Sequence, residues 1–267
     1  VDKEAVVRNG IVPESMKDQI VDEIVWRIPD NINYLYKNDL MLLDFMASND
    51  WTRAVYFTSL SDIKNVLGID KYLHQEGLSH RFIPVVASDY HKDAGGVYVD
   101  GSYELLMADD IRWGNLNYPD VAVDPESRRN LLFVKQAYMR LAEALVNRNQ
   151  NDSAIAVLDK CQEFFPDEKI PYDLYMMAYP EIYYRAGAIE KGDELINKII
   201  ANCLDNLRYY GDLDDKFIPY YTESIRENLA MINEMSNVAS RYNRMELKIS
   251  LENTLDQEFN KFLSIFN

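Results

Sequence analysis

The side chains best suited to metal or acid–base chemistry are three histidines and a large number of carboxylates. The histidines are His74, His80 and His91, and Asp89 and Asp93 flank the last of them. A zinc site needs such side chains to converge, and a general acid needs a carboxyl group whose pKa is raised in an apolar pocket. The histidine spacing matches no ligand pattern, and acidic residues are mostly found on solvated surfaces. We therefore expect no metal site, no cofactor and no catalytic residue, with the histidines on the surface.

Nucleophilic and phosphate-binding chemistry also lack their usual motifs. The chain has no Gly-x-Ser-x-Gly, no phosphate-binding loop and no Gly-x-Gly-x-x-Gly. The two cysteines, Cys161 and Cys203, form no Cys-x-x-Cys pair, so a metal knuckle or redox motif is not indicated. Both lie in helical patterns and are expected to be small buried residues, and their spacing leaves open whether they pair.

Composition indicates a globular protein and restricts its partners. The 267 residues include 28 Lys and Arg against 44 Asp and Glu, which gives a formal charge of −16. Such a chain repels phosphate backbones and anionic membrane surfaces, so nucleic acid is not expected as a partner. No apolar run reaches the roughly 18 residues that a membrane helix needs, so we expect no insertion into a bilayer. The chain does not begin with Met, which favours a piece of a larger protein.

The first part of the chain mixes short helices with short strands. Segments 53–58 and 81–86 are rich in β-branched and aromatic residues and are the best strand candidates. About 20 residues of partly helical chain join them, a length that suits a crossover and a parallel pair, and Pro84 suggests an edge strand. The other expected elements are helices at 13–28, 39–46 (capped by Asn38) and 103–111, helical turns at 61–67 and 70–74, a turn at Gly95–Gly96 and a weak strand at 97–99.

From Asp124 onwards the pattern is helical almost to the end. Asp124 is placed to cap a helix whose first residue is Pro125. Breaks are expected at 149–151, 166–171, 186–188 and 211–215, and two long helices at 217–241 and 245–266. The predicted fold class is α+β, mainly α: a small α/β portion (1–123) with a short, partly parallel sheet, followed by tetratricopeptide-like helical hairpins (124–267).

Residues 135–166 fit the tetratricopeptide pattern at all of its defining positions. The pattern requires small residues where the two helices of a hairpin cross, because large side chains would force the helices apart. Ala142 and Ala154 occupy these positions. The other matches are Tyr138, Leu141, Leu145, Leu158, Cys161 and Pro166. A second unit from Asp173 is looser, with fits at Tyr183, Gly187, Gly192 and Ile196 and misfits at Pro180 and Ile199. The alternative is a generic pair of amphipathic helices.

The first helix of each tetratricopeptide hairpin lines the concave face of the array, where a partner would bind. Both repeats place a glutamate at the ninth position, so Glu143 and Glu181 are expected to project into one groove beside adaptable methionines. Such a groove favours a peptide or protein loop that carries Lys or Arg next to an apolar anchor. The alternative is that this face packs on another part of the chain. The predicted partner-binding residues are Gln136, Met139, Glu143, Asn147, Met177, Glu181, Tyr184 and Arg185.

Several short motifs, in order along the chain, carry a resemblance to a known family. Residues 37–44 read KNDLMLLD, residues 49–57 NDWTRAVYF and residues 72–84 YLHQEGLSHRFIP; further motifs are SRR at 127–129, RLAEAL at 140–145, AIAVLDKC at 154–161 and PYD at 171–173. From Val12 to Gly187 the chain resembles the soluble C-terminal region of a Gram-negative family of multi-pass membrane proteins of unknown function. The membrane part of that family resembles GT-C protein O-mannosyltransferases. Ala54 stands where the family has proline.

The resemblance implies a non-catalytic accessory and interaction domain of a membrane glycosyltransferase-like protein. Any transferase carboxylates would belong to the membrane part, so no catalytic residue is carried over to this chain. The resemblance also implies a position on the periplasmic side of the inner membrane, with the membrane part of the same full-length chain as a partner. Two alternatives stay open: a free-standing soluble carbohydrate-active enzyme that uses two carboxylates, and a stand-alone repeat adaptor.

Overall fold

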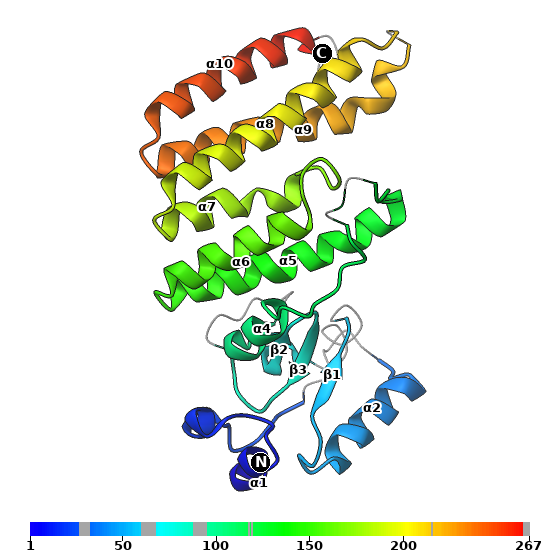
Figure 1. Ribbon diagram of the computed structural model, residues 1–267. Coiled ribbons are helices and arrows are strands. Elements are labelled where there is room, and N and C mark those ends of the chain that lie inside the picture. The colour runs from blue at the N-terminus through cyan, green and yellow to red at the C-terminus, as the bar shows by residue number, and fades with distance from the viewer. Residues whose placement is uncertain are drawn as a thin grey trace. The chain divides into compact units, whose positions relative to one another are not determined.

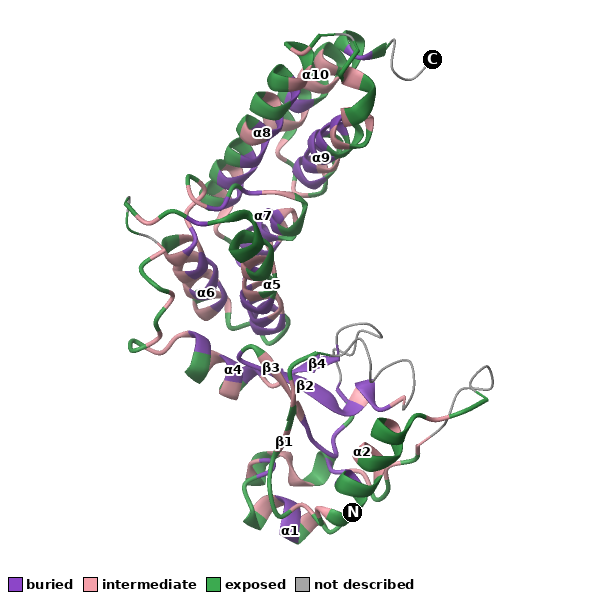
Figure 2. Ribbon diagram, turned by 90° about the vertical axis from the view of Figure 1, so that its right-hand side faces the viewer, coloured by how far each residue is buried: buried purple, intermediate pink, exposed green. Residues whose placement is uncertain are grey.

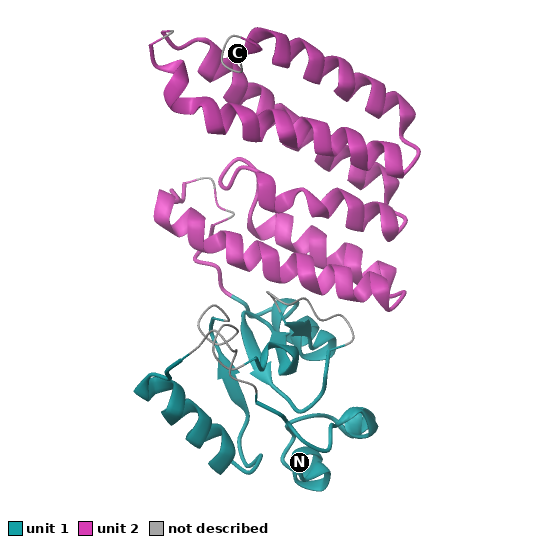
Figure 3. Ribbon diagram, turned by 180° about the vertical axis from the view of Figure 1, so that it is seen from behind, with its two compact units in different colours: residues 1–111 teal, residues 112–267 magenta. Residues whose placement is uncertain are grey.

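The computed structural model describes residues 1–26, 33–59, 68–87, 95–116, 118, 120–214 and 216–263. The chain divides into two compact units, residues 1–111 (unit 1) and 112–267 (unit 2), shown in Figure 3. Unit 1 holds a small sheet with short helices and unit 2 is helical, so the predicted α+β, mainly α class is confirmed. The sequence placed the division at residue 123, whereas residues 112–123 lie with unit 2. There Trp113 packs against Phe165 with ring centroids 5.2 Å apart.

Unit 1 is built around a four-stranded sheet in the order β1-β3-β2-β4 (Figure 1). Its elements are α1 (Lys3–Arg8), the 3₁₀ helix η1 (Glu14–Gln19), α2 (Lys37–Ser48), β1 (Val55–Phe57), the 3₁₀ helix η2 (Asp70–Tyr72), β2 (Leu73–Glu76), β3 (Ser79–Phe82), β4 (Gly96–Val97) and α4 (Val99–Leu106). The strand predicted at 53–58 is confirmed. The helical turn predicted at 70–74 extends only over Asp70–Tyr72, because β2 begins at Leu73. The turns expected at 61–67 lie outside the described residues.

The predicted pairing of the first two strands was wrong. β1 and β3 are antiparallel, with Val55 opposite Phe82. The intervening chain supplies β2, which forms an antiparallel hairpin with β3, and the parallel pair is β2 with β4. Pro84 was expected on an edge strand, but β3 lies between β1 and β2 and ends before the proline. A proline beyond the strand end removes no N–H from the ladder.

The helix predicted over 13–28 was also wrong over its described residues. Only η1 is helical, and the chain after it runs extended beside the segment that follows β3. Ile20 forms an antiparallel bridge with Val85, and the Val21 N–H donates to the Pro84 carbonyl at 2.9 Å. Ile20 is thereby buried in an apolar cluster with Ile83 and Val85. Tertiary pairing has overridden a helical pattern of apolar residues.

Three predicted elements of unit 1, two helices and the weak strand, have different bounds in the structure. α2 begins at Lys37, and the Asp39 carboxylate accepts from the Tyr36 N–H at 2.8 Å, so Asn38 is not its cap. α4 covers Val99–Leu106 rather than 103–111, which leaves only Gly96–Val97 to the weak strand. Gly95 precedes that strand with a φ of 65°, and an added Cβ would lie 2.3 Å from the Leu73 carbonyl oxygen. Only glycine fits this close approach.

Unit 2 is a succession of helical hairpins, α5/α6, α7/α8 and α9/α10 (Figure 1). Its elements are α5 (Pro125–Asn147), α6 (Asn151–Phe164), the 3₁₀ helix η3 (Leu174–Met176), α7 (Ala178–Arg185), α8 (Ile189–Gly211), the 3₁₀ helix η4 (Ile218–Tyr221), α9 (Thr222–Arg241) and α10 (Met245–Lys261). Figure 2 shows buried residues along α5 to α9, whereas α10 buries only Leu251 among its described residues.

Several predicted boundaries of unit 2 are confirmed. Asp124 caps α5, its carboxylate accepting from the N–H groups of Glu126 and Ser127 at 3.0 and 3.1 Å, and Pro125 is the first helical residue. The predicted break at 149–151 separates α5 from α6, and α10 begins at Met245 as expected. The end of the last predicted helix, 264–266, lies outside the described residues. Pro180 is the third residue of α7, where a helix needs no N–H, which explains why this misfit is tolerated.

Candidate functional site

The predicted partner-binding residues lie on the first helices of two successive hairpins, α5 and α7. Gln136 and Asn147 are exposed, and Met139, Glu143, Met177, Glu181 and Arg185 are partly exposed. Tyr184 is only 4% exposed. Most of the predicted residues are therefore accessible to solvent, whereas Tyr184 is buried.

The glutamate of the first repeat is held by a cation of the second. A guanidinium nitrogen of Arg185 on α7 lies 3.5 Å from Glu143 Oε1 on α5. The other terminal nitrogen of Arg185 donates to Asn147 Oδ1 at 2.5 Å. Three of the eight predicted residues thus form one contact between hairpins. Since the side chains of Glu143 and Arg185 keep 41% and 29% of their exposure, solvent screens this pair.

The glutamate of the second repeat has an equivalent arrangement with the third hairpin. Glu181 on α7 accepts from Arg241 at 2.9 Å and from the Tyr242 hydroxyl at 3.2 Å. Arg241 also lies 3.2 Å from Glu234 on α9. Each ninth-position glutamate is therefore neutralised by an arginine from the following hairpin. Sequence reasoning missed Arg241 and Tyr242 because they lie 60 and 61 residues beyond Glu181.

Tyr184 is covered by the same third hairpin. Its ring centroid lies 5.0 Å from that of Tyr242, and its hydroxyl donates to Asp193 Oδ1 at 2.7 Å. Arg244 binds the Asp193 carboxylate through Nε at 3.1 Å and through a terminal nitrogen. Burial, followed by the hydrogen bond to Asp193, raises the pKa of Tyr184. Tyr184 thus packs between hairpins, and its ring does not contribute to an open groove.

A buried polar cluster lies behind this face, in the core of unit 2. Lys135 on α5 has no exposed surface; its Nζ donates to the Ile170 carbonyl at 3.0 Å and lies 5.0 Å from the centre of the Tyr172 ring. Burial lowers the pKa of Lys135, and burial also raises the pKa of the nearby Asp173 carboxyl group. These contacts fasten the chain between α6 and η3 onto α5.

Cys161 belongs to the same cluster and is unsuited to nucleophilic chemistry. Its Sγ lies 3.2 Å from the Tyr179 hydroxyl, which itself donates to the Lys135 carbonyl at 2.7 Å. Burial raises the pKa of the Cys161 thiol to about 12, so the reactive thiolate is absent at neutral pH. Cys161 and Cys203 are both free and both buried, as small core residues should be.

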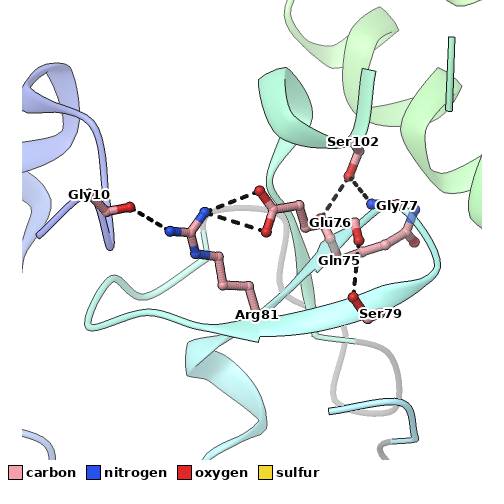
Figure 4. A network of polar contacts seen from close by, with 7 residues as sticks. All are labelled: Gly10, Gln75, Glu76, Gly77, Ser79, Arg81 and Ser102. Atoms are coloured by element: carbon pink, nitrogen blue, oxygen red, sulfur yellow. Dashed lines mark hydrogen bonds and ion pairs between the residues drawn. The ribbon is translucent and has the colours of Figure 1, made fainter. Parts of the chain in front are cut away.

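Unit 1 contains a second polar network, centred on Glu76 and Arg81 (Figure 4). One guanidinium nitrogen of Arg81 lies 3.1 and 3.4 Å from the two Glu76 carboxylate oxygens, and the other donates to the Gly10 carbonyl at 2.5 Å. The guanidinium also lies over the rings of Tyr56 and Tyr98, at 5.8 and 5.9 Å. Burial, with the hydrogen bond to Glu76, raises the pKa of Tyr56 to about 12.

The Glu76–Arg81 network ties the sheet to its neighbours. The Ser102 hydroxyl of α4 donates to the Gln75 carbonyl at 2.8 Å and accepts from the Gly77 N–H at 3.3 Å. Arg81 reaches back to the chain after α1 through Gly10. With side-chain exposures of only 10% and 12%, Glu76 and Arg81 form an almost buried ion pair. A pair of this kind fixes the orientation of the elements that it joins.

The two histidines that the structure describes, His74 and His80, belong to no group of residues that could hold a metal ion. His74 is buried, 4% exposed, with its Nε2 2.9 Å from the Val85 carbonyl oxygen, so its expected surface position was wrong. The reason is that β2 is buried along its whole length. His91, Asp89 and Asp93 lie outside the described residues. Within the described ranges, no three His, Cys, Asp or Glu residues are grouped so that they could hold a metal ion.

Comparisons with known proteins relate one part of the chain to a family. Among the helices that the structure describes, none is long and apolar enough to cross a membrane. No curated protein and no solved structure matches the chain. Residues 1–100, which include the whole four-stranded sheet, match the family model of TMEM260-associated domain 2, so this part of the chain is similar to a domain that accompanies a TMEM260-like membrane protein.

Proposed function

We propose that the chain is a non-catalytic accessory and interaction domain of a membrane glycosyltransferase-like protein related to TMEM260. The observation that carries this proposal is the match of residues 1–100 to TMEM260-associated domain 2. The internal contacts of the polar clusters described above also support it. Glu76 is locked to Arg81, and the Cys161 thiol is protonated at neutral pH. The membrane part of the full-length chain is the first partner, and the periplasmic side of the inner membrane is the proposed location.

Unit 2 is the protein-interaction part of this proposal, as a tetratricopeptide-like array. Ala142 and Ala154, at the proposed helix crossing of the first hairpin, have no exposed surface. A partner that carries Lys or Arg would reach Glu143 and Glu181 by competing with Arg185 and Arg241. Such an exchange of ion pairs gives modest affinity that weakens with salt, because exposed pairs contribute little and are screened.

Site-specific crosslinking in the full-length membrane protein tests the proposal. Photoreactive residues at Gln136 and Met139 on α5 are expected to crosslink to the membrane part or to a bound peptide or protein loop. A photoreactive residue at Glu163, exposed on α6, is the matched control and should give no such product. Equal crosslinking from both helices would contradict a specific partner face on α5.

An activity assay separates this proposal from a free-standing carbohydrate-active enzyme. The purified chain is expected neither to hydrolyse glycosides nor to transfer sugars. Turnover that disappears when one carboxylate is replaced by its amide would show that the chain itself is the catalyst and would remove the accessory-domain proposal.

A further inference from the structure

Unit 1 contains a half-open pocket that none of the contacts above uses. Its volume is about 830 Å³, and its lining residues come from the N-terminal segment with α1, from the segment after η1, from α2 with the turn that follows it, and from Phe82 of β3. Ligand pockets of about 300–1,000 Å³ combine an apolar wall with a few polar groups that orient the ligand. This pocket has both: aromatic rings from Trp26, Trp51 and Phe82, and polar groups from Asp2, Arg8, Asn9, Asp50 and Thr52.

The backbone at the rim of this pocket is strained. Asp50 and Trp51 are consecutive non-glycine residues with φ values of 46° and 58°. The left-handed region is unfavourable for a bulky side chain such as tryptophan, and strain of this kind concentrates at functional sites. It persists only where surrounding structure imposes it. Here the Asn9 side-chain amide donates to the Trp51 carbonyl at 2.9 Å, and the Thr52 N–H donates to the Asn49 carbonyl at 2.9 Å.

The indole of Trp51 is held in place by packing. It stacks on Phe82 with ring centroids 5.4 Å apart and an interplanar angle of 15°. It also packs against both apolar clusters of unit 1, yet remains partly exposed. Trp26 is likewise partly buried against one of these clusters. Trp51 and Trp26 thus supply two partly exposed aromatic rings to this pocket.

We propose that this pocket binds a short neutral oligosaccharide. A pyranose ring has an apolar face of C–H groups that packs on an indole, and a rim of hydroxyls that both donate and accept hydrogen bonds. The Asp50 carboxylate would accept from hydroxyls, as would the Asp2 oxygen that does not cap α1. The guanidinium of Arg8 would donate to hydroxyls, as would the amide hydrogen of Asn9 that is not bound to the Trp51 carbonyl. The formal charge of −16 opposes an anionic ligand, and the hydroxyls of an uncharged sugar match a rim that offers both acceptors and donors.

Titration of the full 267-residue chain with neutral trisaccharides of glucose, mannose or N-acetylglucosamine tests this site. Two of the three tryptophans line the pocket, so saturable binding is expected to change the tryptophan fluorescence. Asp50→Gly is the decisive variant, because it removes the carboxylate and relieves the positive φ. It should raise the melting temperature yet weaken trisaccharide binding about tenfold or more.

Asn149→Gly is the matched control. Asn149 also has a positive φ, 59°, but lies in the turn between α5 and α6. This variant should leave trisaccharide affinity unchanged. The proposal is overturned if none of the trisaccharides binds the folded wild-type chain, or if Asp50→Gly binds as tightly as the wild type. Saturation by an indole-bearing dipeptide in place of every trisaccharide would overturn it as well.

Discussion

The α5/α6 and α7/α8 hairpins differ at the positions that the tetratricopeptide pattern reserves for small residues. The first places Ala142 on α5 and Ala154 on α6, both without exposed surface. The second has Pro180 on α7 and Gly192 on α8 at these positions. Gly192 also lies under the ring of Tyr184 on α7, so closely that an added Cβ would lie 2.4 Å from Tyr184 Cε1. The comparison teaches that the missing Cβ of a glycine leaves room for an aromatic ring from the facing helix, room that an alanine would not leave.

Among the variants that test this comparison, Ala142→Leu should have the largest effect on stability. The added atoms would enter a fully packed position between helices, so the free energy of unfolding should fall by about 1–3 kcal/mol. Chemical denaturation monitored by circular dichroism measures the loss. Ala201→Leu on the exposed side of α8 is the control and should change stability by less than about 0.5 kcal/mol. Equal effects of the two variants would remove Ala142 from a packed crossing.

Gly192→Ala should be destabilising despite the higher helix propensity of alanine. The propensity gain of about 1 kcal/mol opposes the displacement of the Tyr184 ring, leaving a net loss of about 1–2 kcal/mol. In the background of Tyr184→Ala the same change should become stabilising, because the ring that it meets is gone. Additive effects in this double-mutant cycle would show that Tyr184 and Gly192 do not share one packing site.

Alkaline pH should act more strongly on the tyrosine-rich second hairpin. Burial raises the pKa of Tyr179 and Tyr183 above the ordinary value of 10.0, so their stabilising contribution is full below pH 10 and is lost as the pH rises. Burial also raises the pKa of the Cys203 thiol from 9.0 to about 12, so its contribution to stability is lost as the pH rises from 9 to 12. Tyrosinate absorbance should therefore rise together with loss of helical circular dichroism. Titration of all tyrosines in a still folded chain would contradict this.

The ion pairs between hairpins should have the smallest effect. Arg185→Gln and Glu143→Gln remove a partly exposed pair, so the double-mutant coupling energy should be about 0.2–1 kcal/mol and should shrink in high salt. Thermal unfolding at low and high ionic strength measures it. A larger coupling that salt does not affect would indicate that the pair is desolvated.

Local signals in the sequence were sufficient for much of the fold. Asp124 followed by Pro125 predicted the start of α5, because capping depends on neighbouring residues alone. β2 could not be predicted in this way: its residues His74, Gln75 and Glu76 are polar and yet buried. Their burial depends on partners elsewhere in the chain, such as Val85 for His74 and Arg81 for Glu76.

The same holds for the candidate sites: residues placed by local sequence patterns could be predicted, and contacts from distant parts of the chain could not. The register of the helices placed Glu143 and Glu181 on the first helices of successive hairpins. It gave no indication of Arg241 and Tyr242, which come from the next hairpin. The strained turn at Asp50 and Trp51 has no sequence pattern, since asparagine or glycine is the usual residue at such φ values.

The β2–β3 hairpin also determines the order in which the sheet can assemble. Its strands are joined by Gly77 and Leu78 alone, with Glu76 opposite Ser79, and Gly77 has the positive φ that a tight turn requires. Closing so short a loop takes microseconds and little entropy, whereas β1 and β4 must each close a longer loop to reach it. We therefore expect β2 and β3 to pair first and to act as the template on which the two outer strands dock.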